Sequence, residues 1–571
     1  MKNKDVAEIL YEIADILDIK GEIFFKTRAY RMAAQKIEVL DEKIDDLVEQ
    51  KKLTNIEGIG EAISKKITEL VETGKLKYYE DLKKEIPQGV LDMLKISGLG
   101  PRKISKIYNK LEIRNIEQLK SACKKKKLRD LDGFGEITEK NILRGIKMLE
   151  KTSGRAFLNV AYEDGRKYIE FLEGCKEIKR LSLAGSLRRR KETIGDLDIL
   201  ASSEKPKIVM DYFVDYENVK RVLLKGSTKT SVILNDDLQV DLRVVSDKSF
   251  GAALQYFTGS KEHNVKMRSI AIKNGYKLNE YGLFEKDTEK YIVGKDEEQI
   301  YKKLGLSYIP PELRENRGEI ETALEKKLPK LVDCKDIKGD LHVHSNYSDG
   351  VEKIEDIAKK AKKMGYEYVG IADHSQSLRI ARGLSENRVK KKIGEIKKLN
   401  KKIPGIHIFC GTECDIKTDG SLDYSKKTLE MFDFVGIGIH TKFKMDKKEA
   451  TNRIIKGMEN KYSTFLAHPT CRIISHREPL DLDIEKILDK AEETNTYMEI
   501  NSFPDRLDLN DIHTKMAKDR NVKIVINTDA HNLDQLDFIT YGVATARRGG
   551  LTKKDILNTK KLNEIKKIFG M

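Results

Sequence analysis

Three aspartates in the middle of the chain have the spacing of a metal-dependent phosphoryl-transfer site. Asp196 and Asp198 are two residues apart in a predicted strand, so their side chains project to the same face. Asp241 lies in a second predicted strand and would complete the cluster. Carboxylate oxygens hold hard cations such as Mg²⁺ or Mn²⁺, and a pair of such cations can activate a hydroxyl and stabilise a leaving pyrophosphate.

A glycine-serine turn precedes these aspartates. Gly185, Ser186 and Arg189 are placed to neutralise phosphate charge, and Gly195 stands directly before Asp196. An isolated Asp-x-Asp pair is about as often part of a solvated surface strand, but the preceding turn favours phosphate binding.

A second set of candidate ligands follows the apolar runs of the last third of the chain. His342 and His344 alternate at the end of one predicted strand, so their imidazoles point to one side. Later apolar runs end in further residues of this type: His374, Glu413, His440, His468, Asp529 and His531. One such histidine is more often a hydrogen-bonded core residue. Repetition at successive strand ends instead favours a metal centre at the carboxyl ends of a parallel barrel.

A Gly-x-Gly turn recurs three times before residue 150, each time between an apolar run and a basic helix. The pairs are Gly58 with Gly60, Gly98 with Gly100, and Gly133 with Gly135. Glycine lets a turn approach a phosphate, and the N–H groups that begin the next helix can bind it without reading a base. One copy would be a plain helical hairpin, but three copies with flanking lysines predict helix-hairpin-helix DNA binding.

The composition favours a polyanionic partner. The 571 residues carry a formal net charge of +16 and give a pI of about 9.1, which favours nucleic acid, although a lysine- and glutamate-rich solvated surface is the plainer alternative. The six cysteines include no C-x-x-C pair, which argues against a disulfide framework or a thiolate zinc site. No segment approaches the ~20 apolar residues of a membrane span. We therefore expect a cytoplasmic, nucleoid-associated protein with no membrane contact.

Over about its first 315 residues the chain resembles DNA polymerase beta and its family X relatives within the nucleotidyltransferase superfamily. Besides the motifs above, the resemblance rests on the segment Tyr256-Phe257-Thr258-Gly259-Ser260, followed by Asn264 and Arg268. It implies that Asp196 and Asp198 bind both metals and that Asp241 acts on the primer hydroxyl. The segment from Tyr256 to Arg268 would contact the incoming nucleotide and the template. Gln239 departs from the family pattern, which has an arginine there.

The N-terminal helical region resembles the lyase domain of the same family. Lys66 falls at the position of the lysine that attacks an abasic sugar through a Schiff base, and Lys26 and Tyr30 match residues beside a 5′-phosphate pocket. Ala62 replaces another pocket lysine of the family. The resemblance implies binding of a downstream 5′-phosphate and makes lyase activity a further candidate.

Roughly residues 336 to 571 resemble the PHP family, the phosphoesterases named for polymerase and histidinol phosphatase. The resemblance adds Asp349 to the eight residues listed above, and it implies that all nine hold three metals, with Glu413 bridging two of them. Mixed nitrogen and oxygen ligands accept Mn²⁺, Zn²⁺ or Fe²⁺, of which Mn²⁺ or Zn²⁺ is expected.

These patterns predict a multidomain fold of helical, α+β and α/β parts. Residues 1–85 would form a lyase-like helix-hairpin-helix domain and 86–150 a second helix-hairpin-helix subdomain. A nucleotidyltransferase palm (151–245), a nucleotide-selecting thumb-type subdomain (246–315), a linker (316–335) and a distorted (β/α)7 PHP barrel (336–571) would follow.

The resemblances together imply a template-directed DNA polymerase that fills short gaps in base excision repair. The PHP domain would add a 3′–5′ exonuclease and, as a further candidate, abasic-site endonuclease or 3′-phosphoesterase activity. Gapped or nicked DNA and deoxynucleoside triphosphates would be the partners of a monomeric enzyme. One alternative is a PHP nuclease whose weak polymerase half, suggested by Gln239, acts as a DNA clamp. A non-catalytic repair scaffold is another, but a scaffold has no need of so many metal ligands.

Overall fold

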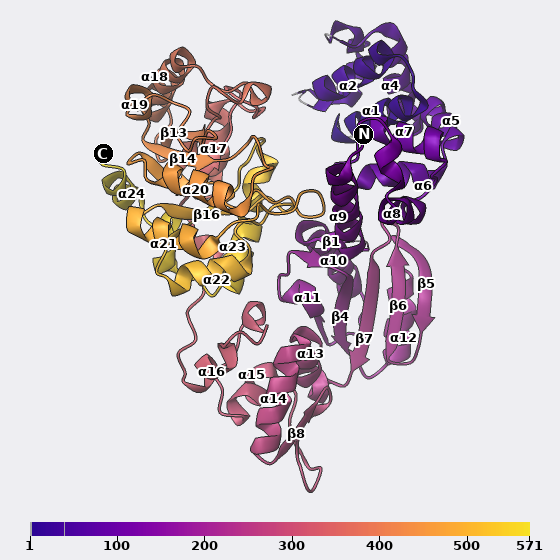
Figure 1. Cartoon of the computed structure of the whole chain (residues 1–571). Coiled ribbons are helices and arrows are strands. Elements are labelled where there is room, and N and C mark those ends of the chain that lie inside the picture. Colours follow the sequence, from indigo (N-terminus) through magenta and orange to yellow (C-terminus); the bar gives the residue numbers. More distant parts are fainter. Residues whose placement is uncertain (1–2, 39, 41, 57, 97, 153) are drawn as a thin grey trace. The chain divides into compact units, whose positions relative to one another are not determined.

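The computed structural model describes residues 3–38, 40, 42–56, 58–96, 98–152 and 154–571 (Figure 1). Contacts divide the chain into two compact units. The first comprises Met1–Ser153 together with Ile474–Glu478, and the second comprises Gly154–Ile473 together with Pro479–Met571. No helix of the described residues has the length and apolar character that crossing a membrane requires.

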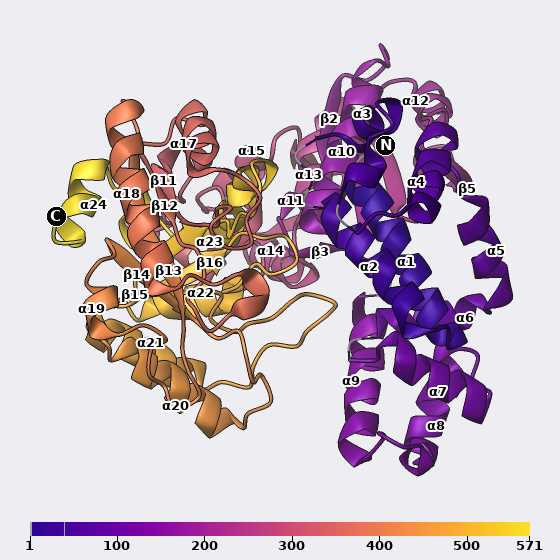
Figure 2. The ribbon, with the colours of Figure 1, turned by 90° about the horizontal axis from the view of Figure 1, so that it is seen from above.

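The first unit is helical. Its helices are α1 (Asn3–Lys20), α2 (Phe24–Glu38), α3 (Ile44–Glu49), α4 (Glu61–Thr73), α5 (Lys77–Glu85), α6 (Gln88–Leu91), α7 (Pro101–Leu111), α8 (Ile116–Lys124) and α9 (Glu136–Thr152). The long helices α1 and α2 lie side by side (Figure 2). One hydrophobic core runs from Val6 to Ile146, so the two helical domains expected from the sequence share their core.

The three Gly-x-Gly turns take the conformation that the sequence predicts. The first glycine of each pair has a positive φ, 93° at Gly58, 80° at Gly98 and 83° at Gly133, where a side chain would be strained. The second glycine directly precedes α4, α7 or α9. A Cβ atom added at any of these second glycines would meet nothing within 4 Å, so each turn presents open backbone in front of a helix N-terminus.

The second unit begins with a palm built on a five-stranded sheet of order β2-β4-β7-β6-β5. Its strands are β2 (Arg180–Leu183), β4 (Asp196–Ser202), β5 (Val219–Lys225), β6 (Lys229–Leu234) and β7 (Gln239–Val245); β1 (Ala156–Phe157) and β3 (Thr193–Ile194) form a separate pair. The helices are α10 (Leu158–Glu173), α11 (Gly185–Arg188) and α12 (Pro206–Val214). Apolar residues of α10, α12 and the sheet share one core, in which the rings of Tyr168 and Phe213 lie 4.9 Å apart.

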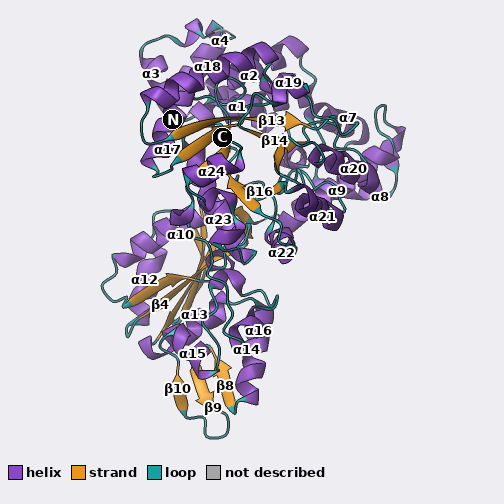
Figure 3. Cartoon of the chain, turned by 90° about the vertical axis from the view of Figure 1, so that its left-hand side faces the viewer, coloured by secondary structure: helices purple, strands orange, loops and turns teal. Residues whose placement is uncertain are grey.

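A smaller thumb follows the palm, and Figure 3 shows its strands beside α14. It contains α13 (Phe250–Thr258), α14 (Lys261–Lys273), the antiparallel strands β8 (Tyr276–Asn279), β9 (Gly282–Glu285) and β10 (Tyr291–Val293), and α15 (Glu297–Lys303). Helix α16 (Glu319–Leu324) falls within the expected linker, yet Ile320 and Ala323 belong to the thumb's core. The connection to the barrel is therefore shorter than residues 316–335.

The rest of the unit is a barrel of seven parallel strands in chain order. The strands are β11 (Gly339–Val343), β12 (Tyr368–Ile371), β13 (His407–Asp415), β14 (Phe434–Gly438), β15 (Ser463–Leu466), β16 (Tyr497–Asn501) and β17 (Ile524–Asn527). The helices are α17 (Ile354–Lys363), α18 (Glu386–Lys402), α19 (Lys426–Leu429), α20 (Lys447–Met458), α21 (Ile484–Thr494), α22 (Asp511–Asp519), α23 (Ile539–Arg548) and α24 (Leu562–Ile568). The His344 N–H donates to the Ala530 carbonyl at 2.8 Å, so the first and last strands meet.

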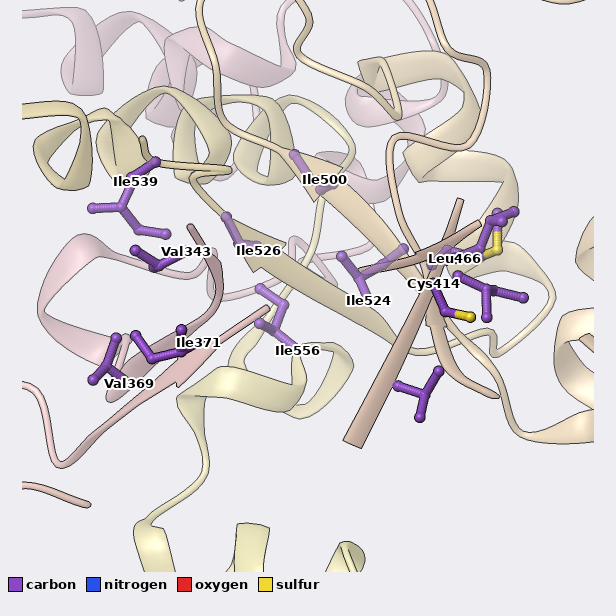
Figure 4. Close-up of a cluster of buried hydrophobic side chains, with 14 of the residues drawn as sticks. Val343, Val369, Ile371, Cys414, Leu466, Ile500, Ile524, Ile526, Ile539 and Ile556 are labelled. Atoms are coloured by element: carbon purple, nitrogen blue, oxygen red, sulfur yellow. The ribbon is translucent and has the colours of Figure 1, made fainter. Parts of the chain in front are cut away.

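Alternation along these strands separates two apolar layers. Val343, Ile371, Ile500 and Ile526 belong to the core formed with the helices (Figure 4). A second cluster contains Tyr368, Phe409, Phe434, Phe465 and Val525. Each is adjacent in its strand to a residue of the first core, namely Val369, Ile408, Val435, Leu466 and Ile526, so the two sets alternate. Apolar residues thus fill the barrel body and leave the carboxyl ends of the strands to polar residues.

A buried ion cluster joins palm and thumb. Glu297 accepts hydrogen bonds from Arg314 at 2.6 Å and from Arg188 at 2.6 and 2.9 Å, and the Arg314 side chain is fully buried. Burial by itself would raise the pKa of Glu297, but the two arginines lower it to about 2. Because the folded-state pKa is depressed, this stabilisation is present above about pH 4.5 and is lost as the pH falls towards 2.

We expect Glu297→Gln to lower the stability of the second unit at neutral pH. The change leaves the buried guanidinium of Arg314 and the half-buried one of Arg188 short of a counter-charge, and breaking a buried pair costs about 3–5 kcal/mol. The midpoint of thermal unfolding should fall by several degrees, whereas the exposed neighbour variant Glu298→Gln should leave it unchanged. Equal midpoints for both variants would contradict this account of the cluster.

Candidate active sites

The palm sheet brings the three aspartates together. Asp198 in β4 lies directly beside Asp241 in the parallel strand β7, and Asp196 precedes Asp198 by one strand repeat on the same face. Burial, followed by the charges of Asp196 and Asp241, raises the pKa of Asp198 to about 7. The pKa of Asp196 is raised as well, by burial and then by the charge of Asp241. Carboxylates crowded in this way fit a site that receives divalent cations.

Gly185 makes room for this cluster. Its φ is +59°, and a Cβ atom at this position would lie 2.1 Å from Asp198 Oδ2. Only glycine lets the turn that begins α11 pass so close to the Asp198 carboxylate. On the other side, a Cβ atom on Gly195 would lie 3.0 Å from Arg155 Nη1.

Two side chains, those of Gln239 and Lys229, hold Asp241. Gln239 stands at the position where the family pattern has an arginine. Gln239 Nε2 donates to Asp241 Oδ1 at 2.9 Å, and Lys229 Nζ of the neighbouring strand β6 lies 2.6 Å from Asp241 Oδ2. Burial would raise the pKa of Asp241, but these hydrogen bonds lower it below its usual value. Gln239 therefore supplies the hydrogen bond and Lys229 the positive charge. Lys229 carried no signal in the sequence, because only strand pairing places it there.

We expect Lys229→Met to lower the kcat of single-nucleotide addition by roughly 10- to 100-fold, the usual effect of removing a partner of a metal ligand. The KM for the nucleotide should change little, because the lysine contacts Asp241. Steady-state extension of a primer on gapped DNA measures both constants. Lys225→Met removes an exposed lysine paired with Asp211 and is the matched control. An unchanged kcat would show that Gln239 alone suffices.

The predicted nucleotide-binding residues gather where palm and thumb meet. The rings of Tyr256 and Phe257 lie 5.0 Å apart, and Asn264 Nδ2 donates to the Tyr256 carbonyl at 2.6 Å. Arg189 donates to the carbonyls of Thr258 and Gly259 at 2.7 and 3.2 Å, and its ion-pair partner at 3.0 Å is Glu315. Arg189 and Asn264 thus hold the segment 256–259 through hydrogen bonds to its carbonyl groups.

Two other predicted nucleotide-binding residues do not take part in these hydrogen bonds. Ser186 lies in α11 and Arg268 in α14, and both side chains are half-buried. Neither has a hydrogen bond to that segment among the described residues. Their proposed contacts with a nucleotide stay predictions.

All nine predicted PHP ligands lie at the carboxyl ends of the barrel strands or in the loops that follow. Their atoms form three groups, within each of which all ligand atoms lie within 4.8 Å of one another. The groups are His344, Asp349, His374 and His531; His342, His344, Glu413 and Asp529; and His374, Glu413 and His440. The ninth residue, His468, places Nε2 at 2.7 Å from Glu413 Oε1. Glu413 is thus shared by two groups.

The donor atoms of this site fit metal coordination better than hydrogen bonding. Buried Glu413 Oε2 and His374 Nδ1 are 2.9 Å apart, yet neither has a hydrogen bond of acceptable geometry. The Nε2 atoms of His342 and His344 face each other at 3.1 Å. Ligands about 2.0–2.1 Å from one cation lie about 3 Å from each other, so these spacings suit shared divalent metals.

Further carboxylates orient the ligands. Glu499 Oε1 lies 2.8 Å from His342 Nδ1, and Asp415 Oδ1 lies 3.2 Å from His440 Nδ1. Asn501 donates to Asp529 at 3.0 Å. Such partners fix the ring orientation of metal-binding histidines. These partner residues were not among the candidates from the sequence, although Glu499 and Asn501 end an apolar run just as the predicted ligands do.

Their positions near barrel strand ends or after them make Arg472, Arg547 and Arg548 candidates from the sequence for binding DNA phosphates, but all three have partners inside the unit. Arg472 donates to Glu192 of the palm at 2.7 Å and to the carbonyls of Arg506 and Leu507. Arg547 pairs with Glu312 at 2.7 Å, and Arg548 pairs with Asp511 and Glu315 at 2.6 and 3.1 Å. These arginines tie the barrel to the palm and the thumb, so the structure gives them a different role from the one first considered.

The candidate lyase residues gather around one tyrosine of the first unit. Lys66 Nζ lies 4.8 Å from the ring centroid of Tyr78, and the ring of Tyr30 stacks on Tyr78 at 6.3 Å. Lys26 Nζ donates to Glu22 at 3.2 Å, and its pKa is raised because Glu22 and Tyr78 outweigh its burial. Tyr78 carried no signal in the sequence, because it comes from α5.

Known proteins share this architecture. Family models match the chain as a helix-hairpin-helix domain (1–76), a SAM-like helix-hairpin-helix tandem (90–148), a DNA polymerase beta thumb (253–315) and a PHP domain (340–503). Over 567 residues the chain is 38% identical to the DNA polymerase/3′-5′ exonuclease PolX of Bacillus subtilis, with 99% of each protein covered. The chain belongs to the PolX family. Membership in the PolX family confirms the fold class expected from the sequence.

Other relatives match one half of the PolX architecture each. A repair DNA polymerase X of African swine fever virus is 27% identical over 179 residues, which is 29% of this chain and 99% of the viral protein. A probable phosphatase of a Thermoanaerobacter species is 28% identical over 231 residues, 38% of this chain and 89% of that protein. The PolX chain thus joins two modules that also occur separately.

Proposed function

We propose that this PolX-family protein is a template-directed DNA polymerase and a 3′–5′ exonuclease, with the two activities in separate metal sites. The proposal is supported most strongly by the assembly of two complete ligand clusters in one chain whose whole length is similar to PolX. DNA and nucleotides are its substrates. Filling of short gaps in base excision repair is the role that fits best.

In the palm, Asp196 and Asp198 would hold two divalent cations, with Mg²⁺ or Mn²⁺ suited to carboxylate oxygens. Such cations neutralise the charge that develops on the transferred phosphate. Asp241, held by Gln239 and Lys229, would accept the proton of the primer's 3′-hydroxyl. Tyr256 and Phe257 would lie beside the nucleotide sugar.

In the barrel, the nine ligands would hold three divalent metals, for which we favour Mn²⁺ or Zn²⁺ over Fe²⁺. The metals supply the Lewis acidity that hydrolysis of a phosphodiester needs. Glu499 and Asp415 would keep the histidine rings in place. The same centre could act at an abasic site or on a 3′-phosphate.

The first unit would bind gapped or nicked DNA. Its three open Gly-x-Gly turns can approach backbone phosphates, and Lys26, Tyr30 and Lys66 are proposed to bind the downstream 5′-phosphate. Lyase activity would require an unprotonated Lys66 amine. Reduction with borohydride in the presence of an abasic substrate would trap such an intermediate, and Lys66→Ala should abolish the trapping.

A single assay tests the proposed function. A labelled primer on a one-nucleotide gapped duplex is incubated with the wild-type protein and Mn²⁺, with and without deoxynucleotides. We expect extension with nucleotides, shortening from the 3′ end without them, and neither reaction in excess EDTA. Shortening without any extension would replace the proposal by a PHP nuclease whose polymerase half is a DNA clamp.

A monomeric state and a cytoplasmic, nucleoid-associated location remain predictions of the sequence. Size-exclusion chromatography with light scattering would test the first, and cell fractionation would test the second. A stable dimer would contradict the monomer prediction.

A further inference from the structure

A pocket of about 250 Å³ in the second unit has five basic side chains among its eleven lining residues. We call it the junction pocket, because one wall comes from the palm, another from the barrel, and Arg317 from the segment after the thumb. Its cations are Arg155, Arg190, Lys191, Arg317 and Arg548. The barrel side adds Asn510, Asp511, Ile512 and Thr545.

The two carboxylates in the lining are already neutralised. Asp511 pairs with Arg317 at 2.9 Å and with Arg548 at 2.6 Å. Burial opposes ionisation of Asp511, but the two arginines lower its pKa below the usual value. Glu192 pairs with Arg472, which is not part of the lining. The remaining palm cations therefore determine the charge of the pocket.

Three cations of the pocket form no ion pair with a described residue. Among the described residues, Arg155, Arg190 and Lys191 have no carboxylate within ion-pair distance. Arg155 is nevertheless held, because Nε and Nη2 donate to Thr193 at 3.0 and 2.6 Å. The Arg190 guanidinium lies 4.2 Å from the ring centroid of Tyr162. Guanidinium groups held in this way are suited to phosphate oxygens.

Short chains of contacts connect this pocket to both active sites. Arg155 lies against Gly195, the residue before Asp196. On the other side, Glu192 pairs with Arg472, and Arg472 donates to the Arg506 carbonyl. Arg506 Nε is 3.8 Å from Oδ2 of the PHP ligand Asp529. Contacting residues thus link the pocket to both predicted metal sites.

We propose that the junction pocket binds backbone phosphates of a single-stranded 3′ end of DNA on its way between the palm and the barrel metal centre. This inference rests on the proposed function, because only an enzyme that both extends and trims needs such a passage. A DNA phosphate is favoured over a free phosphoanion, because the pocket is lined by both the palm and the barrel and its three cations without an ion pair are spread over the palm wall.

The test uses the full-length protein and a labelled gapped duplex whose primer ends either fully paired or in a three-nucleotide unpaired 3′ end. Binding is measured by fluorescence anisotropy in EDTA over a range of salt concentrations. For Arg190→Ala/Lys191→Ala we expect roughly tenfold weaker binding of the unpaired substrate and a salt dependence reduced by about one phosphate contact per cation removed. Binding of the paired substrate should change less than about twofold.

Three further variants guard against misfolding and general charge effects. Ile512→Glu adds a carboxylate at an exposed lining residue and should weaken binding of the unpaired substrate, whereas Ile512→Gln should not. Lys179→Ala/Lys205→Ala removes two exposed palm lysines outside the pocket and is the charge-matched control. Thermal midpoints equal to that of the wild type would establish that the variants fold.

Equal losses on both substrates, or no loss on either, would overturn the inference. So would variants that lose pyrophosphate binding, measured by calorimetry, while binding the unpaired end normally, because the pocket would then serve free phosphoanions. If the wild type extends and shortens primers while the pocket variants behave like it, only this inference fails. If the wild type does neither, the proposed function fails.

Discussion

Glu413→Gln should reduce 3′–5′ exonuclease activity by about 10³-fold, which corresponds to about 4 kcal/mol of lost transition-state stabilisation. Glu413 is fully buried, and its two oxygens face His440 and His468 on one side and His374 on the other. The amide keeps the size of the side chain but cannot serve as a charged bridge between two metals. Single-turnover digestion of a labelled single strand measures the loss.

Two accompanying measurements make this result specific. Metal content by mass spectrometry should fall below that of the wild type, and primer extension should stay within about twofold. Glu493→Gln changes an exposed glutamate of α21 and should alter neither activity. A Glu413→Gln protein that keeps its full metal content and its nuclease activity would show that this residue does not bridge metals.

Asp198→Asn should reduce nucleotide addition by about 10³-fold while the exonuclease stays within about twofold of the wild type. Asp198 lies between Asp196 and Asp241, so the amide removes one of the carboxylates that the cations need. The change also relieves repulsion among like charges, and the thermal midpoint should therefore not fall. Primer extension on a one-nucleotide gap measures the activity.

The control for this variant is Asp215→Asn, which changes an exposed aspartate after α12. Retention of more than about a tenth of wild-type extension by Asp198→Asn would mean that the cluster does not carry the polymerase reaction. Loss of both activities together would mean instead that the two sites depend on each other.

The sequence by itself determined which residues could do the chemistry and roughly which elements carry them. Side chains two apart on a strand share a face, and polar residues after apolar strands of a barrel gather at one end. Asp196 and Asp198, and eight of the nine predicted PHP ligands, could therefore be grouped from spacing, whereas Asp349 came only from the family resemblance. The Gly-x-Gly turns could also be predicted, because a backbone position with a positive φ favours glycine.

Only the tertiary structure decided the partners that come from other elements. Strand pairing places Lys229 beside Asp241. Tyr78 lies on another helix and contacts the candidate lyase residue Lys66. Glu499 lies beside His342 from another strand of the barrel. Arg472 and Arg548, which looked free to hold DNA, instead pair with Glu192 and with Asp511 and Glu315. The spacing of residues along a chain indicates which of them share a face of one helix or strand. A contact between two elements depends on how they pack, and no periodic pattern in the sequence predicts that packing.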